Sequence, residues 1–164
     1  MKKETYIKMT QPFRDHPGMA MGLHIINRIC MAIMYLCYPI LLIFLLVSKE
    51  EAVVKVFLVP AISFVLLSLG RYVINRKRPY EAFDLPPVLK KDTKGKSFPS
   101  RHVFSATIIA MTYLLMSPWP MVGIFLLVVA VVEAVVRVLS GVHYISDVVA
   151  GIVVGVVASL FYLI

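Results

Sequence analysis

Long apolar runs, separated by short polar junctions, make up most of the sequence. Five runs stand out, at residues 29–47, 52–70, 103–116, 119–136 and 148–164. The first contains 19 residues without a charge, which is close to the length that a helix needs to cross the hydrocarbon core of a bilayer. The pattern therefore predicts an all-α, polytopic membrane helix bundle with about five transmembrane helices.

The segments between the runs differ in length and character. Residues 1–28 mix charged side chains with Met, Phe, Ile and Leu, which favours an N-terminal interfacial segment at the membrane surface. Residues 75–100 form one long loop, rich in Lys, Pro and Asp. Counting crossings places both segments, and the junction between the last two runs, on the same side of the bilayer. Charged residues rather than a small-residue cleavage site follow the first run, so we expect that helix to be retained.

Composition supports lipid as the solvent for most of the chain. Of the 164 residues, 60% are hydrophobic and 16% are charged, whereas soluble domains have about 45–50% and about 25%. A single domain, residues 1–164, is the natural expectation at this length. The net charge of +8 raises the question of nucleic acid, but the basic residues cluster between apolar runs and lack the aromatic-plus-basic patches suited to RNA. We therefore expect a bilayer and a membrane lipid as partners and no nucleic acid, with the oligomeric state left open.

Three junctions on the same predicted side carry cations, histidines or both. Guanidinium groups match phosphate oxygens in bidentate geometry, so several around one point favour a phosphate site. Flanking positive charge at a membrane surface would explain the arginines one by one, but not two histidines and a nearby aspartate. The candidate residues are Arg71, Arg78, Ser100, Arg101, His102, Arg137, His143 and Asp147.

Local patterns suggest how such a site would work. Ser100 stands where the N-cap of the third apolar helix is expected, and free backbone N–H groups there would point at an anion. His143 and Asp147 are four residues apart, so on one helix face the carboxylate could accept the imidazole N–H and leave the other nitrogen nucleophilic. If the last helix begins after His143, this argument is weaker. Gly141 favours a helix end there, so that Arg137 and His143 can meet the same ligand.

The three junctions resemble the three signature motifs of the type 2 phosphatidic acid phosphatase (PAP2) superfamily, which also contains the vanadium haloperoxidases. The family pattern of Lys, six residues and Arg-Pro corresponds to RYVINRKRP at residues 71–79. Pro-Ser-Gly-His corresponds to PSRH at 99–102. Ser-Arg, five residues, His, three residues and Asp corresponds to VRVLSGVHYISD at 136–147. Order and internal spacing agree in all three, and the resemblance covers about residues 52–164.

The chain departs from the family pattern at three positions. Arg71 replaces Lys, which keeps the positive charge on a longer, forked side chain. Arg101 replaces Gly and adds a donor where the family offers only backbone. Val136 replaces Ser and removes one hydroxyl that could contact phosphate.

The resemblance implies a role for each candidate residue. His143 would attack phosphorus and form a phosphohistidine, Asp147 would orient it, and His102 would protonate the leaving oxygen. No cofactor or metal is implied, because phosphoryl transfer depends mostly on positioning and charge stabilisation, and cations are plentiful. The phosphoryl oxygens would be held by Arg71, Arg78, Ser100, Arg101 and Arg137.

Three further residues within the apolar runs suggest tertiary contacts. Glu133 lies four residues before Arg137, the favourable order for a helical pair. We interpret it as a residue that aims Arg137, with a plain intramembrane ion pair or another contact as the alternatives. Gly151 and Gly155 form a GxxxG pattern, which predicts close packing of the last helix against a neighbour.

Together these features predict a metal-independent, integral-membrane phosphatase acting on a lipid phosphate or pyrophosphate. Isoprenyl pyrophosphate, phosphatidylglycerophosphate and phosphatidate are all compatible with the resemblance. The alternative is a membrane protein that binds or carries phosphorylated lipids without hydrolysing them. We expect a multi-pass protein of the cell membrane. Its flanking positive charge argues for a cytoplasmic site, but many members of the resembled family face the other way, so an extracytoplasmic site is favoured.

Overall fold

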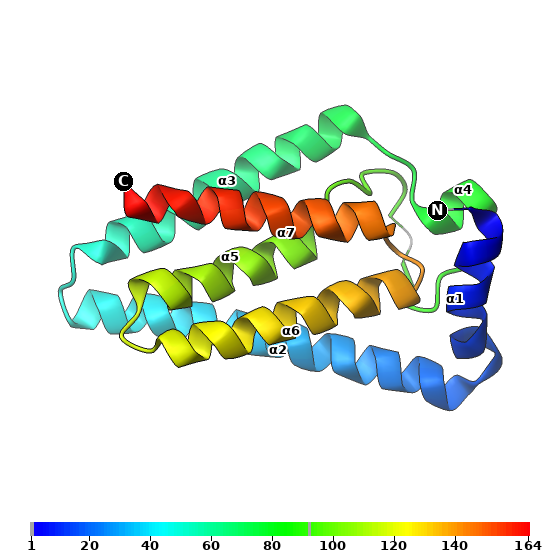
Figure 1. Cartoon of the computed structure of the whole chain (residues 1–164), viewed down its shortest axis with the longest axis horizontal. Coiled ribbons are helices and arrows are strands. Elements are labelled where there is room, and N and C mark those ends of the chain that lie inside the picture. Colours follow the sequence, from blue (N-terminus) through cyan, green and yellow to red (C-terminus); the bar gives the residue numbers. More distant parts are fainter. Residues whose placement is uncertain (1, 92) are drawn as a thin grey trace.

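The computed structural model describes residues 2–91 and 93–164, and helices and loops account for that whole part of the chain. Five long helices run side by side, with a short helix at the N-terminus and another after the second long one (Figure 1). The helices are α1 (Lys3–Asp15), α2 (Pro17–Val47), α3 (Ala52–Ile74), α4 (Pro79–Phe83), α5 (Arg101–Met116), α6 (Pro120–Leu139) and α7 (Ile145–Ser159), which a 3₁₀ turn (Leu160–Leu163) extends.

The bundle has the length and the surface of a membrane protein. Four helical segments, 17–47, 52–83, 120–139 and 145–163, are long and apolar enough to cross a membrane. The shorter α5 packs most extensively against α6 and α7 and contains many buried side chains. Large apolar side chains such as Leu36 and Val73 instead face outward, as expected where lipid replaces water. The predicted all-α membrane bundle with about five spans is confirmed.

The two ends of the bundle differ in content. One end holds α1, α4, the long loop and the turn between α6 and α7, whereas the other holds the α2–α3 and α5–α6 turns and the C-terminus (Figure 1). The three motif segments therefore meet at a single end, as the count of crossings predicted.

The N-terminal region is more helical than the hydropathy pattern indicated. α2 begins at Pro17, well before the apolar run at 29–47, so the segment before that run supplies both α1 and the first turns of α2. Proline is favoured at the first helical position because its missing N–H has no partner there anyway. Tyr6 of α1 is fully buried, and its hydroxyl donates to the Gly141 carbonyl at 3.5 Å. α1 thus packs on the α6–α7 turn.

Glycines let α7 approach α5 closely, as the GxxxG pattern predicted. A Cβ on Gly151 would lie 2.8 Å from the Ser100 carbonyl oxygen, and one on Gly155 would lie 2.8 Å from Thr107 Cβ. The close approach brings the starts of the two helices together, and the Ser100 N–H donates to the Asp147 carbonyl at 2.8 Å. Helix packing therefore joins the second motif directly to the third.

Candidate active site

His143 lies in the turn between α6 and α7, just before the last helix. Gly141 takes a left-handed φ of 74° after the end of α6, and Tyr144 is the N-cap of α7. Sharing of one helix face therefore does not explain how His143 meets Asp147. Instead, Asp147 is the third residue of α7 and its carboxylate reaches back, with Oδ2 accepting the Tyr144 N–H at 3.0 Å and lying 3.4 Å from His143 Nδ1.

The partners of the His143 ring determine its tautomer. Arg78 Nη1 lies 3.4 Å from Nε2, and a guanidinium can only donate. The Asp147 carboxylate can only accept, so we infer that Nδ1 carries the proton and that the lone pair of Nε2 faces Arg78. Burial lowers the pKa of His143 to about 4, with the Arg78 charge adding to the effect and the bond to Asp147 opposing it. The ring is therefore neutral at pH 7, as a nucleophile must be.

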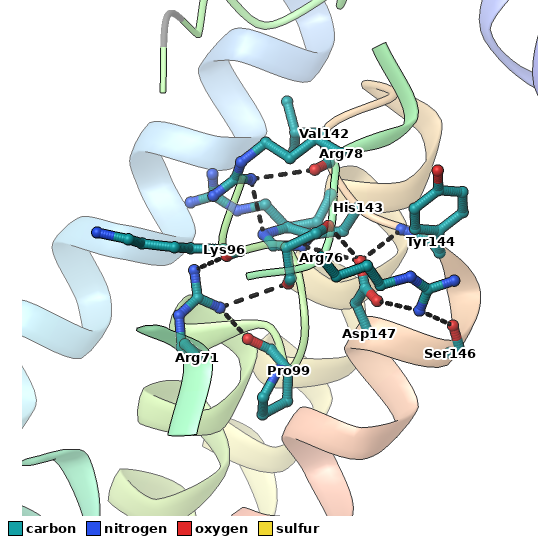
Figure 2. A network of polar contacts seen from close by, with 12 residues as sticks. Arg71, Arg76, Arg78, Lys96, Pro99, Val142, His143, Tyr144, Ser146 and Asp147 are labelled. Carbon is teal, nitrogen blue, oxygen red and sulfur yellow. Dashed lines mark hydrogen bonds and ion pairs between the residues drawn. The ribbon is translucent and has the colours of Figure 1, made fainter. Parts of the chain in front are cut away.

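Asp147 is fully buried and has partners on both oxygens (Figure 2). Arg76 Nη1 is 2.8 Å from Oδ1. The Ser97 hydroxyl donates to Oδ2, which also accepts the Tyr144 N–H and faces His143. Buried carboxylates need such donors, because an unpaired buried charge is strongly unfavourable.

A cavity of about 350 Å³ has both predicted histidines in its wall. Five of its lining side chains are Arg or Lys, and none of the described residues that line it is acidic. A cavity of this charge favours a polyanion such as a phosphate group. It is lined by Ser68, Arg71, Tyr72, Arg78, Lys91, Thr93, Lys96, Arg101, His102 and His143.

The predicted arginines Arg71 and Arg78 also hold the long loop in place. The terminal nitrogens of Arg71, in the last turn of α3, donate to main-chain carbonyls of Lys96 and Pro99 (Figure 2). Arg78 Nε donates to the Gly95 carbonyl at 3.1 Å, and its Nη1 donates to the Val142 carbonyl at 3.1 Å. Both side chains thus bind backbone of the loop or the turn while forming part of the cavity wall.

Ser100 of the second motif and Arg137 of the third are buried but do not line this cavity. Ser100 is the N-cap of α5, as predicted, yet its hydroxyl makes no capping bond. Its Oγ and the Nε of Arg137 are buried without a hydrogen-bond partner in residues 2–91 and 93–164. Such groups are rare in folded proteins.

Glu133 forms the predicted pair with Arg137. The two side chains are almost completely buried, and Glu133 Oε1 is 3.1 Å from Arg137 Nη2. Met31 Sδ lies 3.5 Å from the same nitrogen. The carboxylate therefore neutralises the arginine and limits the directions in which its guanidinium can point.

Three residues at the site were missed by the sequence analysis. Lys91 lines the cavity, and burial, followed by the charges of the surrounding arginines, lowers its pKa to about 8. Nothing local distinguished it from the neighbouring basic residues of the loop. Arg76 and Ser97, which bind Asp147, lie within or beside the motifs. Their position there was a signal, but the distance in sequence to Asp147 concealed the contact.

The arrangement is suited to phosphoryl transfer. It combines a neutral histidine whose free nitrogen faces a cation, a second histidine in the same cavity wall, and cations to stabilise negative charge on phosphoryl oxygens. Among the described residues, no group of three His, Cys, Asp or Glu side chains could hold a metal ion.

Comparison with known proteins agrees with this geometry. The PAP2 superfamily model matches residues 51–164. An undecaprenyl-diphosphatase of Sulfolobus acidocaldarius is 32% identical over 114 residues, which cover 68% of this chain and 54% of that protein. The chain thus spans about half the length of that curated relative.

Two solved structures share the fold over 98% of the chain. Aquifex aeolicus LpxE has a TM-score of 0.74 at 24% identity, with 93% of its chain covered. A PAP2 type phosphatidylglycerolphosphate phosphatase from Bacillus subtilis has a TM-score of 0.71 at 21% identity, with 83% covered. Because the family model matches most of the sequence, including all three motif segments, this chain belongs to the PAP2 superfamily.

Proposed function

We propose that this protein is an integral-membrane phosphatase that hydrolyses a lipid phosphate or pyrophosphate through a phosphohistidine intermediate. The observation that carries the proposal is the neutral His143, whose Nε2 faces Arg78 in a cavity wall with five cationic side chains. A site that only binds phosphate has no need of a buried imidazole fixed in one tautomer by a carboxylate.

The proposed reaction uses the two histidines, which both line the basic cavity. His143 Nε2 attacks phosphorus, and the new N–P bond forms as the P–O bond to the leaving group breaks. His102 gives its proton to the leaving oxygen. Water then attacks the phosphohistidine and gives a proton to His102, and the N–P bond breaks to release inorganic phosphate. Asp147 stabilises the positive charge that the ring of His143 carries in the intermediate.

A lipid fits the surroundings of the cavity better than a soluble phosphate ester. An apolar groove of about 440 Å³ lies between α2, α3 and α5 and includes Phe64. The guanidinium of Arg101, which lines the basic cavity, sits over the Phe64 ring at 5.3 Å. The basic cavity and the apolar groove therefore share a boundary, so a phosphate group and its hydrocarbon chain can be held at the same time.

Phosphate release from purified protein in detergent tests this function. The panel contains an isoprenyl diphosphate, phosphatidylglycerophosphate and phosphatidate, each with and without EDTA. We expect release from at least one lipid, insensitive to EDTA and abolished in His143→Ala. Binding without release from any lipid would favour the alternative, a carrier. Loss of release with EDTA and its return with a divalent ion would contradict a metal-independent reaction.

We further propose that the site faces away from the cytoplasm. Its excess of basic residues has a second explanation, since basic groups attract an anionic substrate as well as directing topology. A cysteine in place of Thr93, which is exposed in the long loop, can be labelled with a membrane-impermeant thiol reagent. Labelling on intact cells is expected, and labelling only after lysis would place the site on the cytoplasmic side.

A further inference from the structure

Arg76 connects the first motif segment to the carboxylate behind the nucleophile. It follows α3, two residues before Arg78. Its Nη1 lies 2.8 Å from Asp147 Oδ1 and 2.8 Å from Ser146 Oγ. The guanidinium also sits over the Tyr144 ring, 4.1 Å from the ring centre. Three neighbouring residues at the start of α7 thus hold this one side chain, which itself does not line the cavity.

The two carboxylate oxygens of Asp147 bind different partners (Figure 2). Oδ1 binds Arg76. Oδ2 accepts hydrogen bonds from the Ser97 hydroxyl and the Tyr144 N–H, and it faces His143 Nδ1. Rotation of the carboxylate would exchange or displace these oxygens. The charged hydrogen bond to Oδ1 opposes that rotation, because such bonds are about twice as strong as neutral ones.

An ordinary surface ion pair would matter little here. Exposed pairs typically contribute little to stability, and the side chain of Arg76 is 37% exposed. Its partner, however, is completely buried and makes the contact that determines the tautomer of His143. Loss of Arg76 therefore acts on the nucleophile more than on the stability of the bundle.

We propose that Arg76 is a positioning residue of the hydrolysis, holding Asp147 through Oδ1 so that Oδ2 stays directed at His143. The proposal rests on the function proposed above. Arg76 acts through Asp147 and does not touch the substrate, so its removal lowers kcat and leaves KM nearly unchanged.

Kinetics of Arg76 variants of the full chain in detergent test the proposal. Misplacement of a reacting group by about 1 Å can cost on the order of 10²-fold in rate, so we expect Arg76→Ala to lower kcat by about 10- to 100-fold. The kcat of Arg76→Lys should lie between those of Arg76→Ala and the unchanged protein, because an ammonium keeps the charge but lacks the planar guanidinium that stacks over the Tyr144 ring. Lys77→Ala, which removes the exposed cation next in the chain, is the matched control and should be unaffected.

Two further measurements separate positioning from a structural role. Guanidinium ion should restore part of the kcat of Arg76→Ala, since the vacated position is partly open to solvent. In an Asp147→Asn background, Arg76→Ala should cost little more. The proposal would be overturned by an unchanged kcat in Arg76→Ala. It would also be overturned if the loss of kcat is not rescued by guanidinium and comes with a lower melting temperature, or if Arg76→Ala lowers kcat by the same factor again in the Asp147→Asn background.

A readout that needs no turnover keeps this test independent of the proposed function. In ¹⁵N-histidine NMR, the His143 signals, assigned by their absence in His143→Ala, should show protonated Nδ1 and unprotonated Nε2. Arg76→Ala should produce a mixture of tautomers. If the protein releases no phosphate from any lipid, the proposed hydrolysis fails, whereas an unchanged tautomer in Arg76→Ala removes the proposed role of Arg76.

Discussion

Replacing Gly151 with alanine tests whether the contact between α5 and α7 builds the active site. A Cβ at this position would lie 2.8 Å from the Ser100 carbonyl oxygen and 3.3 Å from the Phe104 nitrogen. Both are backbone atoms, of the N-cap and the first turn of α5, and cannot rotate away as a side chain could. The two helices must therefore move apart by roughly half an ångström or more before the methyl group reaches an ordinary packing distance of about 3.5 Å.

The expected size of the effect follows from that displacement. Overpacking of a well-packed interior costs about 1–3 kcal/mol, which for a chain of this length corresponds to a melting temperature lower by about 2–12 °C. The same movement stretches the bond from the Ser100 N–H to the Asp147 carbonyl. It separates the second motif from the third, so we expect kcat to fall on the order of 10-fold.

The assay compares Gly151→Ala with two other glycine variants. Gly22→Ala is the matched control, because a Cβ there meets nothing within 4 Å. Gly155→Ala would press on Thr107 instead, one turn farther from the site, and should lower the melting temperature more than kcat. Melting in detergent and phosphate release are measured on all three. A Gly151→Ala protein that melts and turns over like Gly22→Ala would refute the reasoning.

Three other predictions concern single side chains. His102→Ala should lower the rate of phosphate release from a lipid phosphate by about 10²–10⁴-fold, but much less from p-nitrophenyl phosphate, whose leaving group needs no proton. His143→Ala should lose activity on both substrates. If p-nitrophenyl phosphate restores activity to His143→Ala instead, the roles of the two histidines are reversed. The pKa of Lys91 is lowered to about 8, so Lys91 loses its charge as pH rises through that value and kcat/KM should fall there. In Lys91→Arg this fall should move to higher pH. If both proteins lose kcat/KM at the same alkaline pH, Lys91 does not cause the fall. Glu133→Gln leaves Arg137 buried without a counter-ion and should cost about 3–5 kcal/mol of stability, whereas the double variant Glu133→Gln/Arg137→Met should melt higher than the single one.

The hydropathy pattern was enough to predict the architecture. Apolar runs of span length are a local property, because each helix satisfies its own backbone hydrogen bonds in lipid whatever its neighbours are. Motif spacing likewise predicted the pair of Glu133 with Arg137, since residues four apart on a helix are always neighbours. The start of α2 at Pro17 was missed because polar residues in its first turns hide a helix that continues beyond the apolar run.

Only the tertiary structure determined which polar groups meet. Arg76 and Asp147 are 71 positions apart and Ser97 and Asp147 are 50 apart, and no periodicity in the sequence relates such positions. Their contacts depend on how the loop at residues 75–100 folds over the starts of α5 and α7. The same is true of Lys91, which looks like any other basic residue in the sequence but lines the cavity in the structure. The hydrophobicity of each helix can be evaluated from its own sequence. The direction of a charged side chain depends instead on donors and acceptors that distant segments of the chain bring close to it.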